Sequence, residues 1–273
     1  MRSHAICIGA QKAGTTWLHQ VLSKNPRIWV PPFKEVHFFD HLYIPENRRW
    51  TKWHIGRGVE NAKRWNQMSA RPKGPRYVDY LDSLMNDDMF SDPWYRRVFS
   101  IAPPTSTTLD VTPAYLSIGE GGVEHVKKRY TGVKIICLVR DPVDRAISQV
   151  RMTASRLGGN DWSLEDWLEH ADSKEVEIRS DYRKFLPIWR NAFGEDLLIL
   201  PFKSIKNEPH EMLLELERFL GLPGAIYEQA NIKVHEAKGA TLPDPVVEFL
   251  ERKFSSQRDF LGEFWGKSCW GRF

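Results

Sequence analysis

The sequence predicts an α/β protein in which helices cover both faces of a central parallel sheet, giving three layers. Short apolar or β-branched runs, typical of buried strands, recur along the chain, and helical patterns separate them. This alternation favours a parallel sheet, because the chain must cross over between neighbouring strands. The length of 273 residues suits one generous α/β domain, so we expect a single domain over residues 1–273.

Four predicted strands are each followed by turn or helix-start residues. They cover residues 5–8, 107–111, 134–139 and 197–200. In open parallel sheets, ligands bind beyond the carboxyl ends of the strands. Gly9, Val111 and Arg140 occupy such ends, so we expect the binding site there.

Helical patterns fill most of the remaining chain. The predicted helices cover residues 15–23, 123–129, 142–157, 181–193, 208–220 and 243–261. Pro187 falls inside the fourth of these, where a proline would kink or break the helix. Residues 41–102, rich in Trp, Tyr, Arg and Asp, are predicted to form a helical insertion rather than a separate domain.

Composition and charge narrow the class of protein. The formal net charge of +4 is too mild for a typical nucleic-acid-binding domain, but it suits anionic ligands. Cys7, Cys137 and Cys269 match no metal-ligand spacing, and the first two lie in apolar strands as expected for buried free thiols.

The first strand begins within a few residues of Met1, and no apolar run is long enough to span a bilayer. We therefore expect a cytoplasmic protein without a signal peptide or membrane anchor.

Residues 4–18 contain the clearest binding signal. Gly9 and Gly14 bound a loop between a strand and a helix that starts at Thr15. In this geometry, backbone N–H groups and the helix N-terminus converge on a bound anion. The glycine spacing is that of a Walker A loop, but Lys12 lies inside the loop and Thr15 follows Gly14 directly. The loop therefore predicts phosphate binding in a P-loop-like fold that differs from an ordinary ATPase.

Residues 134–149 contain a second candidate anion site. Arg140 follows a strand, Asp141 is a suitable N-cap and Pro142 suits the first helical position. Ser148 falls eight residues after Arg140, about two helical turns along. Arg140 and Ser148 could bracket a second phosphate group, with the arginine binding in a bidentate manner. From the residues alone, a structural salt bridge of Arg140 is an equal alternative.

Together the two motifs resemble the paired signatures of sulfotransferases that use 3′-phosphoadenosine 5′-phosphosulfate. The matching loop residues are Gln11, Lys12, Ala13, Gly14, Thr15, Thr16, Trp17 and Leu18. The resemblance implies that this loop holds the 5′-phosphosulfate, and that Arg140 and Ser148 hold the 3′-phosphate. Residues 34–40 and 110–115 resemble segments of the heparan-sulfate-type O-sulfotransferases, and Lys238 and Gly239 resemble their donor-binding loop.

The resemblance implies transfer of a sulfuryl group to an acceptor hydroxyl, without a required metal, and adenosine 3′,5′-bisphosphate as the product. Lys12 is expected to stabilise the bridging oxygen that gains charge as the bond breaks. Thr15 and Thr16 are expected to donate hydrogen bonds to the 5′-phosphate. A glycan, a lipid-linked sugar or a metabolite suits the acceptor, and the oligomeric state is left open.

The acceptor hydroxyl needs a base, and Glu35 and His37 are the candidates. They share one side of the chain if residues 34–39 are extended. In the heparan-sulfate-type relatives the glutamate of this segment is the base, whereas the soluble small-molecule sulfotransferases use a histidine. A purely structural role of both residues is the third alternative. Apolar neighbours would raise the pKa of Glu35, and Lys34 or Lys12 would lower it.

Two departures from the heparan-sulfate-type pattern bear on the acceptor and the donor. Val111 stands where those enzymes carry a lysine, and Ala240 stands where they usually carry an arginine. The first change weakens the case for a heavily sulfated glycan, and the second removes a possible donor contact.

Two other functions are alternatives to sulfuryl transfer. A P-loop small-molecule kinase would need a magnesium-binding acidic residue and a lysine directly after Gly14, where Thr15 stands. A non-catalytic nucleotide-binding protein would not need Lys12, Arg140, Ser148 and Glu35 together.

Overall fold

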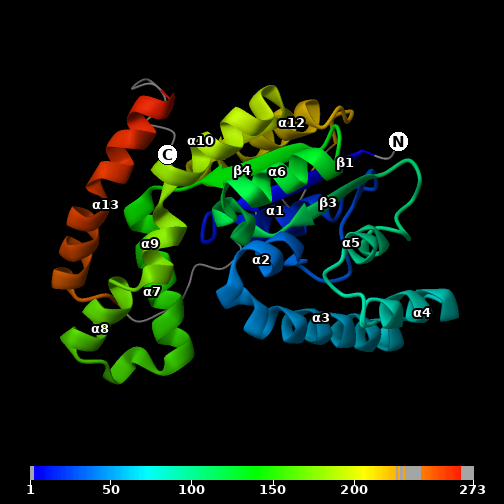
Figure 1. Cartoon of the computed structure of the whole chain (residues 1–273), viewed down its shortest axis with the longest axis horizontal. Coiled ribbons are helices and arrows are strands. Elements are labelled where there is room, and N and C mark those ends of the chain that lie inside the picture. Colours follow the sequence, from blue (N-terminus) through cyan, green and yellow to red (C-terminus); the bar gives the residue numbers. More distant parts are fainter. Residues whose placement is uncertain (1–2, 226, 228–229, 231–240, 266–273) are drawn as a thin grey trace.

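The computed structural model describes residues 3–225, 227, 230 and 241–265 (Figure 1). In this part of the chain five strands form one sheet in the order β2-β3-β1-β4-β5, and every neighbouring pair is parallel. The strands are β1 (His4–Gly9), β2 (Ile28–Trp29), β3 (Thr107–Val111), β4 (Lys134–Val139) and β5 (Leu197–Pro201). The four predicted strands are confirmed. The sequence analysis missed β2, because two residues are too few to show a pattern.

The strand order puts β1 at the point where the direction of the chain reverses. From β1 the chain moves to β2 and β3 on one side, and from β3 it crosses back to β4 on the other. Because such crossovers are right-handed, α1 (Thr15–Leu22) and α6 (Gly119–Arg129) cover opposite faces of the sheet (Figure 1). Ligands bind at this reversal point, beyond the carboxyl end of β1. The loop between β1 and α1 lies there.

Two further helices complete the layers. Helix α10 (Tyr182–Phe193) packs against α6, and α12 (Pro209–Phe219) is linked to the segment after α1 by a hydrogen bond from Asn25 to Glu217 of 2.8 Å. The expected break does not occur, because α10 continues through Pro187. Its buried face holds it in place: Trp189 is fully buried, and its Nε1 donates to the carbonyl of Leu116 at 3.0 Å.

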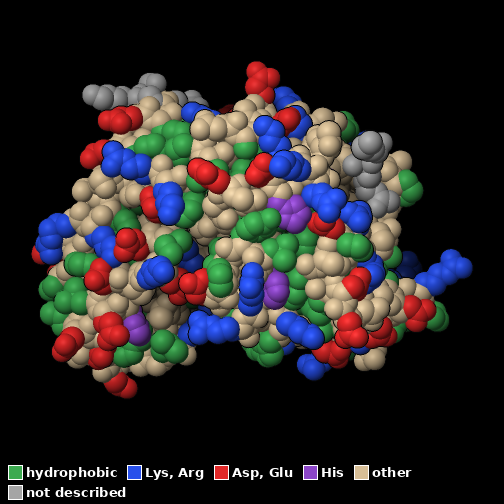
Figure 2. Space-filling model, viewed as in Figure 1, with side chains coloured by type: hydrophobic (Ala, Val, Ile, Leu, Met, Phe, Trp, Pro, Cys, Tyr) green, Lys and Arg blue, Asp and Glu red, His purple; other side chains and the backbone are tan. Residues whose placement is uncertain are grey.

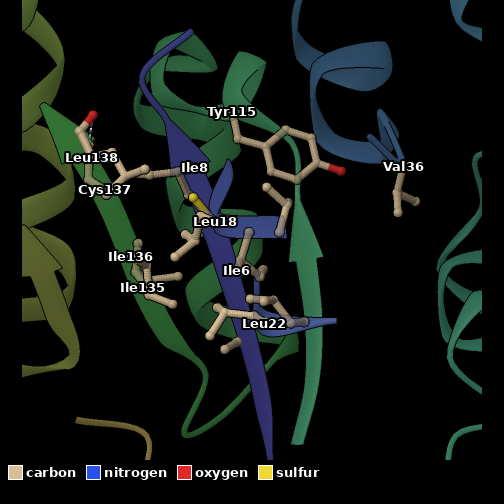
Figure 3. Packing of buried hydrophobic residues seen from close by; sticks show 14 of the residues in the cluster. Ile6, Ile8, Leu18, Leu22, Val36, Tyr115, Ile135, Ile136, Cys137 and Leu138 are labelled. Atoms are coloured by element: carbon tan, nitrogen blue, oxygen red, sulfur yellow. Dashed lines mark hydrogen bonds between the residues drawn. The ribbon is translucent and has the colours of Figure 1, made fainter. Parts of the chain in front are cut away.

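The core lies between the central strands and α1. Figure 3 shows Ile6 and Ile8 of β1 together with Leu18 and Leu22 of α1, all fully buried. Residues 135–138 of β4 extend this core to the neighbouring strand. Cys7 and Cys137 are buried free thiols, as expected. This dense packing gives the loop after β1 a rigid support.

Two helical groups flank the sheet on either side of the binding edge (Figure 1). One contains α2 (Phe38–Tyr43), α3 (Arg48–Met68), α4 (Pro75–Ser83) and α5 (Asp92–Val98), which include the helices of residues 41–102. The other contains α7 (Pro142–Leu157), α8 (Leu164–Ala171), α9 (Lys174–Ser180) and α13 (Asp244–Trp265), which enclose an apolar cluster of their own. Helix α11 (Phe202–Asn207) and short 3₁₀ turns at Pro45–Asn47, Pro113–Ser117, Gly159–Asp161 and Gly194–Asp196 complete the elements.

The predicted helix over residues 142–157 is confirmed as α7. Helix α6 begins at Gly119, earlier than predicted, and α13 runs on to Trp265. The sequence analysis did not predict α8 and α9. No helix in the described ranges has the length and apolar character needed to cross a membrane.

Candidate active site

The loop between β1 and α1 has the form of an anion-binding nest. Lys12 and Gly14 both lie in the left-handed region, at φ 67° and 90°. Such residues, alternating with right-handed ones, turn successive N–H groups toward one point. A Cβ atom on Gly14 would collide with the side chain of Ile205, so a larger residue does not fit. The first-turn amides of α1, at Thr15 and Thr16, have no acceptor within the helix and add to this cradle.

Positive charge surrounds the loop. The Nζ of Lys12 lies 3.5 Å from the sulfur of Met152 in α7. Burial and then the charges of nearby arginines, Arg156 and Arg140 first among them, lower the pKa of Lys12. No carboxylate in the described part of the chain forms an ion pair with Lys12. Because like charges are gathered here without neutralisation, the site suits a ligand with several negative charges.

Arg140 joins this cluster from the end of β4. Its Nη1 donates to the carbonyl of Lys12 at 3.1 Å, and its guanidinium lies 4.6 Å from the ring centre of Phe202. Its buried Nε has no hydrogen-bond partner among the described residues. The expected alternative, a structural salt bridge, is made by the next residue instead: Asp141 pairs with Arg258 of α13 at 2.6 Å. The Nε–H group of Arg140 is therefore available to donate a hydrogen bond to a ligand.

The other predicted donor residues differ in where the structure places them. Gln11 lines a cavity, and Ser148 lies half-buried on α7. Ala13 is fully buried. The side chain of Trp17 is buried in the core, where its Nε1 donates to the carbonyl of Ala230 at 3.1 Å. Lys238 and Gly239 lie outside the described residues, as does Ala240.

The candidate bases meet through a tight turn rather than a strand. Glu35 and His37 have φ values of 71° and 52°, and α2 begins at Phe38, so the expected extended conformation is wrong. The left-handed residues fold the chain back on itself. Nε2 of His37 lies 3.1 Å from a carboxylate oxygen of Glu35, and Nδ1 lies 2.9 Å from Asp40. The turn thus brings together a carboxylate, an imidazole and a second carboxylate.

The sequence analysis missed Asp40. Its carboxylate is fully buried and also accepts a hydrogen bond of 2.7 Å from Asn47. The signal that could have found it is the spacing: Asp40 follows His37 by three residues at the start of a helix, which places the two on one face.

Electrostatics assign a charge state to Glu35 and to His37. Burial alone would raise the pKa of Glu35, but the charge of Lys34, at 2.5 Å, and the ion pair with His37 hold it well below its usual range. Burial opposes the charged form of His37, but the hydrogen bond to Asp40 and the ion pair with Glu35 outweigh it and raise its pKa to about 9. At neutral pH Glu35 is therefore a carboxylate and His37 an imidazolium, which has no free nitrogen to accept a proton.

A buried hydrogen-bond network supports the turn from β3. Oγ1 of Thr112 accepts the N–H of Val36 at 2.8 Å, and the hydroxyl of Tyr115 accepts the N–H of Phe38 at 2.9 Å. Figure 3 shows the Tyr115 hydroxyl on the side of Val36. Both hydroxyls donate to the fully buried carboxylate of Asp110, at 2.6 and 3.0 Å. Burial raises the pKa of Asp110 to about 6.

A cavity of ≈ 340 Å³ lies beside this group. It is bounded by Gln11 of the loop, Trp50 of α3 and Arg179 of α9. The rings of Trp50 and His37 are 4.6 Å apart, edge to face, so the cavity adjoins the turn with Glu35. Its charged lining consists of Arg49, Lys174, Arg179, Glu46 and Glu175. Sequence analysis did not single out Arg179, because it belongs to no motif.

Val111, the first departure from the resemblance, is buried within β3. No positive side chain projects into the site from this position. Among the described residues, no group of His, Cys, Asp and Glu side chains has the arrangement of a metal site.

An anion-binding loop at the reversal point of a parallel sheet, with an ionised carboxylate beside a cavity, defines an enzyme that transfers a group from an anionic donor. The family model described as "Sulfotransferase family" matches residues 5–226. The chain therefore belongs to the sulfotransferase family. The resemblance inferred from the sequence is confirmed, and the kinase alternative is not favoured.

Individual relatives agree with this assignment. Human "Heparan sulfate glucosamine 3-O-sulfotransferase 5" is 27% identical over 245 residues, which cover 86% of this chain and 58% of that protein. The crystal structure of a sulfotransferase from Alicyclobacillus acidocaldarius is similar in fold, with a TM-score of 0.64, 22% identity and coverage of 97% and 96%. The sulfotransferase domain from the curacin biosynthetic pathway has a TM-score of 0.57, with 16% identity and coverage of 94% and 97%. The predicted α/β fold is thereby confirmed.

Proposed function

We propose that the protein transfers a sulfuryl group from 3′-phosphoadenosine 5′-phosphosulfate to an acceptor hydroxyl. The observation that supports the proposal is a cavity that is lined by Gln11 of the Lys12 loop and by Trp50, whose ring contacts His37 in the turn with the ionised Glu35. The donor supplies an activated sulfate. The acceptor oxygen forms a bond to sulfur, the bond from sulfur to the oxygen of the 5′-phosphate breaks, and the acceptor proton passes to Glu35.

The charges of the site fit such a donor. The nest of residues 9–14 and the hydroxyls of Thr15 and Thr16 would hold the 5′ group, with Lys12 stabilising the oxygen that gains charge. Arg140 and Ser148 would hold the 3′-phosphate. The buried Nε of Arg140, without a partner among the described residues, is a donor that such a group would satisfy.

Glu35 is the better candidate for the base. His37 is protonated at neutral pH and holds Glu35 through Nε2, while Asp40 fixes the ring through Nδ1. The depressed pKa makes Glu35 a weak base. A weak base suffices in a loose transition state, as in phosphoryl transfer, because the attacking oxygen gains little charge there. The carboxylate then needs to orient the hydroxyl more than to remove its proton early.

The acceptor we propose is a sugar hydroxyl. The ring of Trp50 offers a flat apolar surface on which a sugar can stack, and the name of the human relative specifies a glucosamine acceptor. Arg49, Lys174 and Arg179 suit an acceptor with a negative group, although Glu46 and Glu175 offset part of this charge. With Val111 buried and uncharged, a heavily sulfated chain is less suitable than a sparsely charged one.

Thermal unfolding with two ligands tests the donor. Adenosine 3′,5′-bisphosphate should raise the melting temperature without magnesium, because a ligand that binds only the native state stabilises it. ATP with magnesium should have little effect. A rise with ATP and magnesium alone would reject the proposal. An assay with labelled donor and glycan, lipid-linked sugar and phenolic acceptors then identifies the acceptor class.

A further inference from the structure

The outward surface of α3 combines positive charge with large apolar side chains. The helix contains six Lys or Arg residues and one Glu. Thr51, Ile55, Val59 and Ala62 are buried against the rest of the protein, so the opposite side of the helix faces solvent. We call this side the outer face of α3; it comprises Arg49, Lys52, Trp53, Arg57, Glu60, Arg64, Trp65 and Met68.

The positive residues follow the helix along one groove. A shallow hollow of ≈ 750 Å³ is lined by Arg49, Lys52, Arg57 and Arg64, with Trp53 and one acidic residue, Glu60, between them. From Arg49 to Arg64 the helix rises about 22 Å. Figure 2 shows Lys and Arg side chains along the lower edge of the molecule, where Figure 1 places α3, with Asp and Glu side chains beside them toward the right.

Three large apolar side chains stand out on the same face. The exposed fractions of Trp53, Trp65 and Met68 are 62%, 68% and 77%. The guanidinium of Arg57 lies 5.0 Å from the ring centre of Trp53, so charge and aromatic surface are presented together. Scattered exposed apolar residues are ordinary, but three on one helix indicate a surface that is covered in use.

We propose that the outer face of α3 docks on a membrane surface that contains anionic lipid headgroups. Lys and Arg are attracted to such a surface, and Trp side chains favour the boundary between headgroups and acyl chains. A soluble polyanion would also bind the positive residues, but it would leave Trp65 and Met68 uncovered. The combination of charge with exposed apolar groups favours the membrane.

Docking would bring the active site to the membrane surface. Arg49 lines both the hollow of α3 and the cavity beside Glu35, so the two are adjacent. An acceptor linked to a lipid could then reach the cavity without leaving the membrane. The docking itself does not depend on the proposed sulfuryl transfer, and it can be measured without donor or acceptor.

Co-sedimentation with vesicles tests the proposal. The protein should bind vesicles of phosphatidylcholine with phosphatidylserine, and bind poorly to phosphatidylcholine alone. The double variant Arg57→Glu and Arg64→Glu should bind the anionic vesicles about 100-fold more weakly or worse, because each positive residue near the surface contributes substantially to the attraction. The double variant Trp53→Ala and Trp65→Ala should bind about tenfold more weakly with the net charge unchanged.

A matched control distinguishes the effect of the outer face on vesicle binding from the effect of net charge. Lys127→Glu with Lys128→Glu, on the far end of α6, changes the net charge equally and should leave vesicle binding near that of the unaltered protein. Equal losses in both charge variants would overturn the proposal, as would an absence of binding to anionic vesicles at ~0.15 M salt. Binding of soluble dextran sulfate through Arg57 and Arg64 without vesicle binding would instead assign the face to a polyanion. Unfolding temperatures of the variants confirm that each is folded.

Discussion

The N–H of Val36 donates to the hydroxyl oxygen of Thr112 at 2.8 Å and ties the turn with Glu35 to the end of β3. Tyr115 makes the equivalent contact with Phe38. Because both hydroxyls give their protons to Asp110, their lone pairs face the turn. A buried carboxylate in the sheet thus orients the proposed base without touching it.

We expect Thr112→Val and Tyr115→Phe each to lower kcat by about 10–100-fold while donor binding is kept. Each change removes one acceptor from a turn whose geometry sets the position of Glu35, and small misplacements of catalytic groups cost rates of this size. Steady-state kinetics and the thermal shift with adenosine 3′,5′-bisphosphate measure the two effects separately.

Tyr95→Phe is the matched control for this pair. The Tyr95 hydroxyl donates to the same Asp110 oxygen at 3.0 Å, but the structure shows no hydrogen bond from it to the turn. Its kcat should stay close to that of the unaltered protein. If Tyr95→Phe lowers kcat as much as Tyr115→Phe, the effect is general destabilisation and not the placement of the turn.

Glu35→Gln should nearly abolish turnover, by about 10²–10⁴-fold, and leave donor binding intact. The amide cannot take the acceptor proton, but it is close to the carboxylate in size. Turnover with labelled donor is the measurement. Near-normal turnover would reject Glu35 as the base.

The charge of His37 predicts a loss of activity and stability at high pH. The native pKa is about 9, above the ordinary value of 6.5, so the native state holds the proton more tightly than the unfolded chain. The resulting stabilisation is complete below pH 6.5 and disappears as the pH rises through 9. Turnover and melting temperature should fall together over this range, and His37→Gln should remove the dependence. A profile that is flat to pH 10 contradicts the pairing with Glu35.

The sequence predicted the parts of this site that depend on local pattern. The loop from Gly9 to Gly14 and the cap at Asp141 were found because neighbouring residues specify a strand–loop–helix geometry. Glu35 and His37 were named as alternative bases that would share one side of an extended chain, whereas in the structure left-handed residues bring them together. These conformations are unusual for residues other than glycine, and no propensity indicates them.

Contacts between distant residues could not be predicted. The bond from Val36 to Thr112 spans 76 positions, and the edge-to-face contact of Trp50 with His37 depends on how α3 packs beneath the turn. Likewise, β2 is defined only by its pairing with β3. Such features arise from tertiary structure, so a single sequence contains no pattern for them.

Arg140→Ala should weaken binding of adenosine 3′,5′-bisphosphate by about 2–4 kcal/mol, the cost of losing a charge-assisted contact to a buried anion. Isothermal titration measures the change directly. Arg76→Ala, on exposed α4, removes the same charge far from the loop and should leave the affinity unaltered. An affinity that Arg140→Ala leaves unchanged would remove this residue from the donor site.

Asp141→Ala should lower the free energy of unfolding by about 1–2 kcal/mol, because it removes a helix cap and a partly exposed ion pair. The carboxylate accepts the N–H groups of Val143 and Asp144, at 2.9 and 3.0 Å, and also pairs with Arg258 of α13. Arg258→Ala should cost less, since it leaves the cap in place. Denaturant unfolding of both single variants and the double variant separates the two contributions. Asp144→Ala, in the same first turn but exposed, is the control, and an equal loss there would show that Asp141 does not act through the cap.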